Sequence, residues 1–204
     1  SMNQYLYLDY FRNTKVLSAF SLVSTVVSLA IAGVTVPLSK RFGKKEVAAA
    51  ATCFSGVAYL ILYFMHITSA WLYMILSVIG FLGVNLFNMV IWANITDVID
   101  DHEVRTGSRD DGTVYSVYSF ARKIGQALAG GLGGAALQAI GYDELATVQN
   151  ARVVEGIYAT VNLIPAVCFL GVAAILAFAY PLSRKKVEEN AAILKKKREM
   201  EQRS

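Results

Sequence analysis

The feature that most limits how this chain can fold is a long stretch without charge. Between Glu46 and Asp97 there is no Asp, Glu, Lys or Arg, and His66 is the only residue there that titrates near neutral pH. A soluble domain would carry more charge and shorter apolar runs. Because one bilayer crossing takes about 20 apolar residues, the stretch is long enough for two. The chain is therefore predicted to be an all-α polytopic membrane protein.

Apolar runs along the whole chain, which is 55% hydrophobic, predict five membrane crossings. The predicted crossings are residues 16–38, 47–65, 70–96, 113–140 and 156–182. Residues 1–15 are aromatic and apolar but too short to span a bilayer, so they are expected to be the end of a truncated transmembrane helix. Residues 183–204 are expected to form a basic, helical, cytoplasmic tail that is either solvated or in contact with anionic lipid.

Lys and Arg residues gather on alternate connections between the predicted crossings. They are frequent in 39–46, 97–112 and the tail, and sparse before residue 16, in 66–69 and in 141–155. The positive-inside rule places the basic set, with the C-terminus, in the cytoplasm. Because the basic residues flank the crossings, the net charge of +4 indicates a lipid bilayer and no nucleic-acid partner.

Residues that could carry enzyme chemistry are absent from the sequence pattern. There is no nucleophile–His–acid set, no phosphate-binding glycine loop, no cofactor fingerprint and no spacing of acids typical of a metal site. Cys53 and Cys168 lie in predicted crossings without a CxxC motif, and are expected to be small buried residues. The chain is therefore not expected to be an enzyme or to hold a metal.

The predicted crossing 113–140 carries two cations, Arg122 and Lys123, well inside it. Lys123 lies about 15 Å from the start of the crossing, which is about half of the hydrocarbon thickness. A cation that faces lipid there costs about 2.5–3.5 kcal/mol. Lys123 shares a polar helix face with Ser119 and Gln126, so it is expected to face a cavity and bind substrate. A structural ion pair is the alternative.

Three further groups of residues are candidates for a site. Asn85, Asn88 and Trp92 share one face of the crossing 70–96, which suits a sugar, although hydrogen bonding between helices explains the pattern equally well. Gly130 and Gly134 form a small-xxx-small pair that is typical of close helix packing. A switchable set of ion pairs, or else a solvated loop, is expected on the basic side, from Asp97, Asp100, Glu103, Arg105, Arg109 and Arg41.

A resemblance to a known family rests on residues 96–130. They have the sequence TDVIDDHEVRTGSRDDGTVYSVYSFARKIGQALAG, a D-x-x-D-x-x-E-x-x-T-G-x-R-x-x-G run followed by F-x-x-K-x-G. This segment resembles the glycoside–pentoside–hexuronide:cation symporters, the melibiose permease-like branch of the major facilitator superfamily (MFS). The basic turn at 37–46, PLSKRFGKKE, is similar to an inter-helix loop of the same superfamily.

The resemblance implies a fold and a function. Such symporters have two bundles of six helices, and this chain corresponds to the second bundle with its first helix truncated. Lys123 falls on the lysine of F-x-x-K-x-G, which implies a role in substrate binding and cation coupling, and Asn88 falls near a pocket position. The cation-binding carboxylates of the family lie mainly in the first bundle.

The expected function is therefore the C-terminal half of a secondary active transporter in a bacterial inner membrane. It would couple uptake of a glycoside, pentoside or hexuronide to Na⁺ or H⁺ by alternating access, with no cofactor besides the coupling ion. Its partners would be the sugar, the cation, the bilayer, and either the missing N-terminal bundle or a second copy of the chain. The alternative is a half-size membrane protein that does not transport and acts only by homodimerising or by pairing with another bundle.

Overall fold

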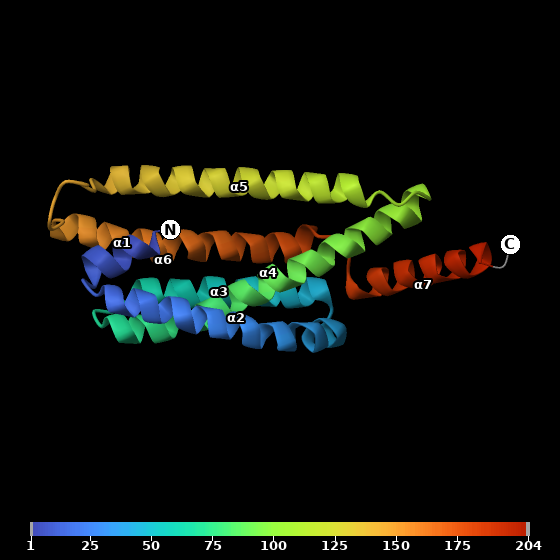
Figure 1. The fold of residues 1–204 in the computed structure, drawn as a ribbon, viewed down its shortest axis with the longest axis horizontal. Helices are drawn as coiled ribbons and strands as arrows, with labels where there is room; N and C mark the ends of the chain where they lie inside the picture. Colours follow the sequence, from blue (N-terminus) through green and yellow to red (C-terminus); the bar gives the residue numbers. More distant parts are fainter. Residues whose placement is uncertain (1, 203–204) are drawn as a thin grey trace.

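The structure, a computed structural model, describes residues 2–202, and this part of the chain contains helices and no strand (Figure 1). The predicted all-α polytopic membrane fold is confirmed. The elements are α1 (Asn3–Tyr5), η1 (Leu6–Tyr10), α2 (Thr14–Phe42), α3 (Lys44–Met65), α4 (Ala70–Thr106), α5 (Asp111–Ile140), α6 (Ala151–Ala174), η2 (Ile175–Ala179) and α7 (Arg184–Glu201). The elements η1 and η2 are single π-helical segments.

Four of the described helices are long and apolar enough to cross a membrane: α2, α3, α4, and α6 continued by η2. Their most apolar stretches have mean hydropathies of 1.8 to 2.4. Helix α5 has 30 residues, which is also long enough, but it does not reach the same apolarity because Lys, Arg, Ser and Gly interrupt its apolar residues. The sequence predicted five crossings, and the one at 113–140 falls in α5. This helix is long enough to span a membrane but is less apolar than the other four.

The connection 97–112, which the sequence suggested to be a loop, is mostly helix. Helix α4 continues to Thr106 and has 37 residues, so it is about 55 Å long, far more than a hydrocarbon core of about 30 Å. The i,i+4 ion pair between Asp101 and Arg105 (2.7 Å) supports this extension. The helix ends only at Gly107, whose φ of 77° is left-handed. The acidic residues of this connection therefore lie mostly on the continuation of α4.

The packing core of the bundle is formed by α3 against α4 and α6, and glycines let these helices approach closely. A side chain at Gly83 of α4 would collide with the carbonyl of Ala51 and the hydroxyl of Ser55 on α3. The Ser55 hydroxyl donates a hydrogen bond to the carbonyl of Gly80 (2.9 Å). Close approach and an interhelical hydrogen bond are the usual means of joining helices in lipid.

Replacing Gly83 with alanine is expected to lower the free energy of unfolding by about 1–3 kcal/mol, because the added methyl group must displace the α3 backbone. Gly33→Ala on α2 is the matched control, since nothing lies within 4 Å of its Cβ position. The control is expected to be neutral or stabilising by about 0.5–1 kcal/mol. Thermal unfolding of the purified variants measures both. Equal melting temperatures would contradict the close contact between α3 and α4.

The far end of the bundle from α7 is joined by buried tyrosines. Tyr158 of α6 donates a hydrogen bond to the carbonyl of Leu62 (2.6 Å) and accepts one from the amide of Ile67 (3.1 Å). Tyr73 donates to Asn162 Oδ1 (2.9 Å). Tyr7 of the short N-terminal helical segment is also buried and packs on Tyr73. These bonds satisfy the backbone where α3 turns into α4, and fix α6 to that turn.

Helix α5 lies along the edge of the molecule beside α6 (Figure 1), and none of its residues is fully buried. The close packing expected at Gly130 and Gly134 does not occur within the described chain, because no atom lies within 4 Å of either Cβ position. Cys53 and Cys168, expected to be buried, are both exposed. Most of the surface of helix α5 is therefore exposed in this part of the chain.

Candidate functional site

The predicted polar face of α5 is open. Ser119, Lys123 and Gln126 are all exposed. Among residues 2–202, no hydrogen bond or ion pair involves the Lys123 ammonium group. A structural ion pair, which was the alternative interpretation of Lys123, is therefore not formed within the described part of the chain. An ammonium group needs water or a ligand around it, since lipid would not satisfy its three donors.

Aromatic and cationic side chains hold α5 against α4 one turn from Lys123. The rings of Trp92 and Tyr118 meet edge to face with centroids 5.2 Å apart. The guanidinium of Arg122 lies over the Trp92 ring, 5.7 Å from its centroid. Such a cation–π contact offsets part of the cost of placing Arg122 in a transmembrane helix. It also fixes Arg122 toward α4, so the adjacent Lys123 points to a different side of α5.

The predicted sugar face on α4 is divided between two environments. The amide oxygen of Asn85 accepts a hydrogen bond from Ser28 of α2 (2.7 Å), so this residue joins two helices. Asn88 is exposed, and its amide nitrogen donates to the carbonyl of Val84 (3.0 Å). Trp92 is half exposed and contacts α5. Asn88 and Trp92 are thus accessible to a ligand, whereas Asn85 is used in packing.

A buried ion pair joins the start of α3 to α4. The ammonium group of Lys44 lies 2.6 Å from the carboxylate of Asp97, which is only 5% exposed, and it also donates to the carbonyl of Ala93. The expectation that Arg41 takes part in the ion pairs is wrong for this structure. The turn at Gly43 directs Arg41 over the ring of Phe42 instead. The cation that reaches Asp97 comes from the first turn of the next helix.

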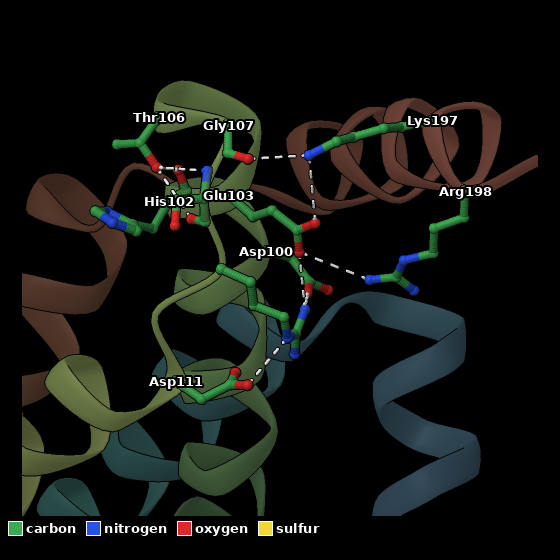
Figure 2. A network of polar contacts seen from close by, with 10 residues as sticks. Asp100, His102, Glu103, Thr106, Gly107, Asp111, Lys197 and Arg198 are labelled. Carbon is green, nitrogen blue, oxygen red and sulfur yellow. Dashed lines mark hydrogen bonds and ion pairs between the residues drawn. The ribbon is translucent and has the colours of Figure 1, made fainter. Parts of the chain in front are cut away.

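The strongest polar feature is a cluster of charges where α4, α5 and α7 meet (Figure 2). We call it the charge cluster and define it by Asp100, Glu103, Arg109, Asp111, Lys197 and Arg198. The guanidinium of Arg109 lies 3.0 Å from each of three carboxylates, on Asp100, Glu103 and Asp111. These hydrogen bonds, with Asp100 first, raise the pKa of Arg109 above its ordinary value. Arg109 therefore stays charged and ties the linker 107–110 back to α4.

The tail helix α7 completes this arrangement, which the sequence did not indicate. Lys197 donates to the carbonyl of Gly107 at the end of α4 (3.0 Å), and Arg198 lies 3.6 Å from Glu103 (Figure 2). Asn190 is buried and donates to Asp101 (2.9 Å). The tail is therefore docked on the α4 extension and not simply solvated.

Replacing Arg109 with glutamine is expected to loosen the linker between α4 and α5. Three carboxylates would face one another without their common cation, so amide hydrogen exchange in residues 107–113 should rise. Arg105→Gln is the matched control, because Arg105 is exposed and its single i,i+4 pair contributes about 0.3–0.5 kcal/mol. Exchange that is unchanged in Arg109→Gln would show that the cluster does not hold the linker.

The structure thus brings three of the six charged candidates together. Asp100, Glu103 and Arg109 form one cluster, while Asp97 and Arg105 pair separately with Lys44 and Asp101. In the described residues no hydrogen bond joins Lys123 to Asn85 or Asn88. The arrangement is that of a membrane bundle with one open polar helix face and one closed ionic end.

Residues 1–184 match the family of MFS/sugar transport proteins, and the chain belongs to this family. The family consists of transporters, in agreement with the expectation that the chain is not an enzyme.

Two relatives illustrate the similarity. An uncharacterised symporter of Bacillus subtilis is 38% identical over 146 residues, which cover 72% of this chain and 31% of the relative. A glucuronide carrier protein homolog of Escherichia coli is 29% identical over 206 residues, which cover 99% of this chain and 44% of the relative. The chain thus spans less than half of the length of these relatives. No solved structure matches it.

Proposed function

We propose that the chain forms one half of a secondary active transporter that couples the uptake of a sugar to a cation. The observation that carries this proposal is Lys123, an exposed ammonium group without a partner in the described residues, in a chain of a sugar transport family. In the proposed protein α5 lines an aqueous cavity, and Lys123 binds the sugar and responds to the coupling cation. Asn88, Trp92, Ser119 and Gln126 add hydroxyl-binding groups and a ring face to the same wall.

The second half of the cavity must come from outside the described residues. The open face of α5, including Gly130 and Gly134, is suited to lie against another bundle. Symporters of this kind bind substrate near the middle of the membrane, between two bundles that rock against one another. We assign the covering bundle to a preceding N-terminal half or to a second copy of the chain, and place the C-terminus in the cytoplasm of a bacterial cell.

The charge cluster is then the cytoplasmic gate. Its ion pairs hold α4, the α4–α5 linker and α7 together in the state seen here. A change in which face is open would require α5 to move relative to α4, and would break the three contacts of Arg109. The Lys44–Asp97 pair keeps the α2–α3 turn attached to α4 during that movement.

Uptake into proteoliposomes tests the proposal. The relatives are described as a symporter and as a homolog of a glucuronide carrier, so glucuronides are the first sugars to test, with Na⁺ and H⁺ gradients imposed separately. The proposal predicts sugar accumulation that needs one of these gradients. It also predicts that crosslinking finds the chain paired with another bundle or with a second copy. A chain that pairs but moves no sugar under either gradient would instead support the alternative, a half-size membrane protein without transport function.

A further inference from the structure

A lateral groove on the bundle is unrelated to the proposed sugar site. Helices α2 and α3 are joined by the tight turn at Gly43, yet α2 packs mainly on α4. A cavity of about 580 Å³ is left between α2 and α3, with α4 as its floor. Its lining is apolar apart from Glu46 at one end. We call this cavity the lateral groove.

The lateral groove continues along the outside of the bundle. Phe54 also lines a second hollow of about 170 Å³, which runs along α3 and α4 to Ile61 and Ile79. From Val47 to Ile61 the path along α3 is about 21 Å. One leaflet of the hydrocarbon core is about 15 Å thick. The two hollows together are therefore long enough for an acyl chain that enters from one membrane surface.

The chemistry of the lateral groove excludes a sugar and water as occupants. Beyond Glu46 the side chains that line it are aliphatic or aromatic, so a hydroxyl would find no partner. Phe54 and Leu82 are 48% and 37% exposed, and both belong to helices that are apolar enough to span a bilayer. In a membrane this surface faces acyl chains.

The end of the lateral groove at the α2–α3 turn is charged. Phe42 lines the groove, and the guanidinium of Arg41 lies 5.3 Å from the centre of its ring. Neither Arg41 nor Lys40 forms an ion pair with a carboxylate in the described residues. Glu46 lies in the first turn of α3, where the helix N-terminus stabilises its charge. The turn therefore keeps a net positive charge without a matching anion.

We propose that the lateral groove binds one phospholipid, with an acyl chain between α2, α3 and α4 and the phosphate diester at Arg41. The apolar path gives room for the chain, and the unpaired guanidinium gives a partner for the phosphate, which Arg binds better than Lys because of its planar fork. The bound lipid differs from the surrounding bilayer lipid because it is held at both ends.

Photocrosslinking tests this site. The chain is placed in nanodiscs with phosphatidylglycerol whose acyl chain carries a diazirine, and with diacylglycerol that carries the same acyl chain but no phosphate. The expected crosslinks map to residues 47–61 and 79–86, and on α2 to Ile31, Leu38 and Phe42. Ala50→Phe, which fills the groove, should reduce them about fivefold or more, while Ala32→Phe at an exposed α2 position outside the groove should not.

Arg41→Gln separates the phosphate contact from simple lipid contact, since Arg41 is exposed and, among the described residues, its side chain touches the groove only through the ring of Phe42. It should reduce labelling by phosphatidylglycerol about three- to tenfold, to the level seen with diacylglycerol. Equal labelling by both lipids in the unchanged chain, or labelling spread evenly over the exposed faces of α2, α3 and α6, would overturn the proposal. Sugar uptake does not enter either readout, so this proposal stands or fails apart from the transport function.

Discussion

Replacing Lys123 with alanine is expected to abolish cation-driven sugar accumulation. Under the proposed function this ammonium group is the charged partner of the sugar in the α5 wall, and a hydrogen bond to a charged group contributes about 1.5–3 kcal/mol. Its loss should weaken sugar binding about 10- to 100-fold and uncouple uptake from the ion gradient. Radiolabelled sugar uptake, with and without the imposed gradient, measures both effects.

Lys196→Ala is the control for this experiment. Lys196 lies on the exposed side of α7, with no ion pair in the described residues, so its loss removes the same charge far from α5. Full cation-driven uptake by Lys123→Ala, at matched amounts of protein in the membrane, would show that the lysine serves the structure and not the substrate.

Removing Lys44 is expected to have the largest effect on stability. The Asp97 carboxylate is 5% exposed, and it would lose the ammonium group at 2.6 Å that offsets part of the cost of its burial. Removing one partner of such a pair costs about 3–5 kcal/mol, so Lys44→Met should lower the free energy of unfolding by about this amount. Thermal or denaturant unfolding in detergent checks the result.

A double variant tests whether the lost stability comes from the Asp97 carboxylate that is left without its cation. Lys44→Met combined with Asp97→Leu removes both charges of the pair, so it should regain most of the stability lost in the single variant. Lys40→Ala, on the same turn but exposed and without an ion pair, should stay within about 0.5 kcal/mol of the unchanged chain. If Lys44→Met behaved like Lys40→Ala, the pair with Asp97 would contribute nothing.

The helical architecture was predictable because it depends on the length of the apolar runs in the sequence. Predicted crossings 16–38, 47–65 and 70–96 all lie inside observed helices, since runs of apolar residues in lipid have no other way to satisfy their backbone. The end of α4 was not predictable from apolarity, because residues 97–106 are mostly polar, are supported by an ion pair, and continue the helix as far as Gly107. Polar helix beyond the bilayer gives no hydropathy signal.

Individual partners in the site could be predicted only in part. The sequence indicated that acids of 97–112 pair with Arg105 and Arg109, since these charges are close along the chain. It did not show that Lys44 and not Arg41 reaches Asp97, because that depends on how Gly43 turns the chain. The contacts of α7 with Glu103 join residues about ninety positions apart, which no local pattern reveals.

The polar face of α5 shows both the value and the limit of the sequence pattern. Periodicity placed Ser119, Lys123 and Gln126 on one face, and all three side chains are exposed. The sequence also suggested packing at Gly130 and Gly134, and no other helix of residues 2–202 comes within 4 Å of their Cβ positions. Small residues show that a close approach is allowed, but the partner must be identified by other means.

The most direct test of the account is the accessibility of position 123 to water. Cys53 and Cys168 are first replaced by alanine, so that any labelling can be assigned to position 123. A cysteine at position 123 is then treated with a membrane-impermeant thiol reagent in right-side-out and inside-out vesicles. We predict labelling from at least one side and protection by the transported sugar. A cysteine at 123 that stays unlabelled from both sides, in a protein that still transports, would contradict the claim that Lys123 faces an aqueous cavity.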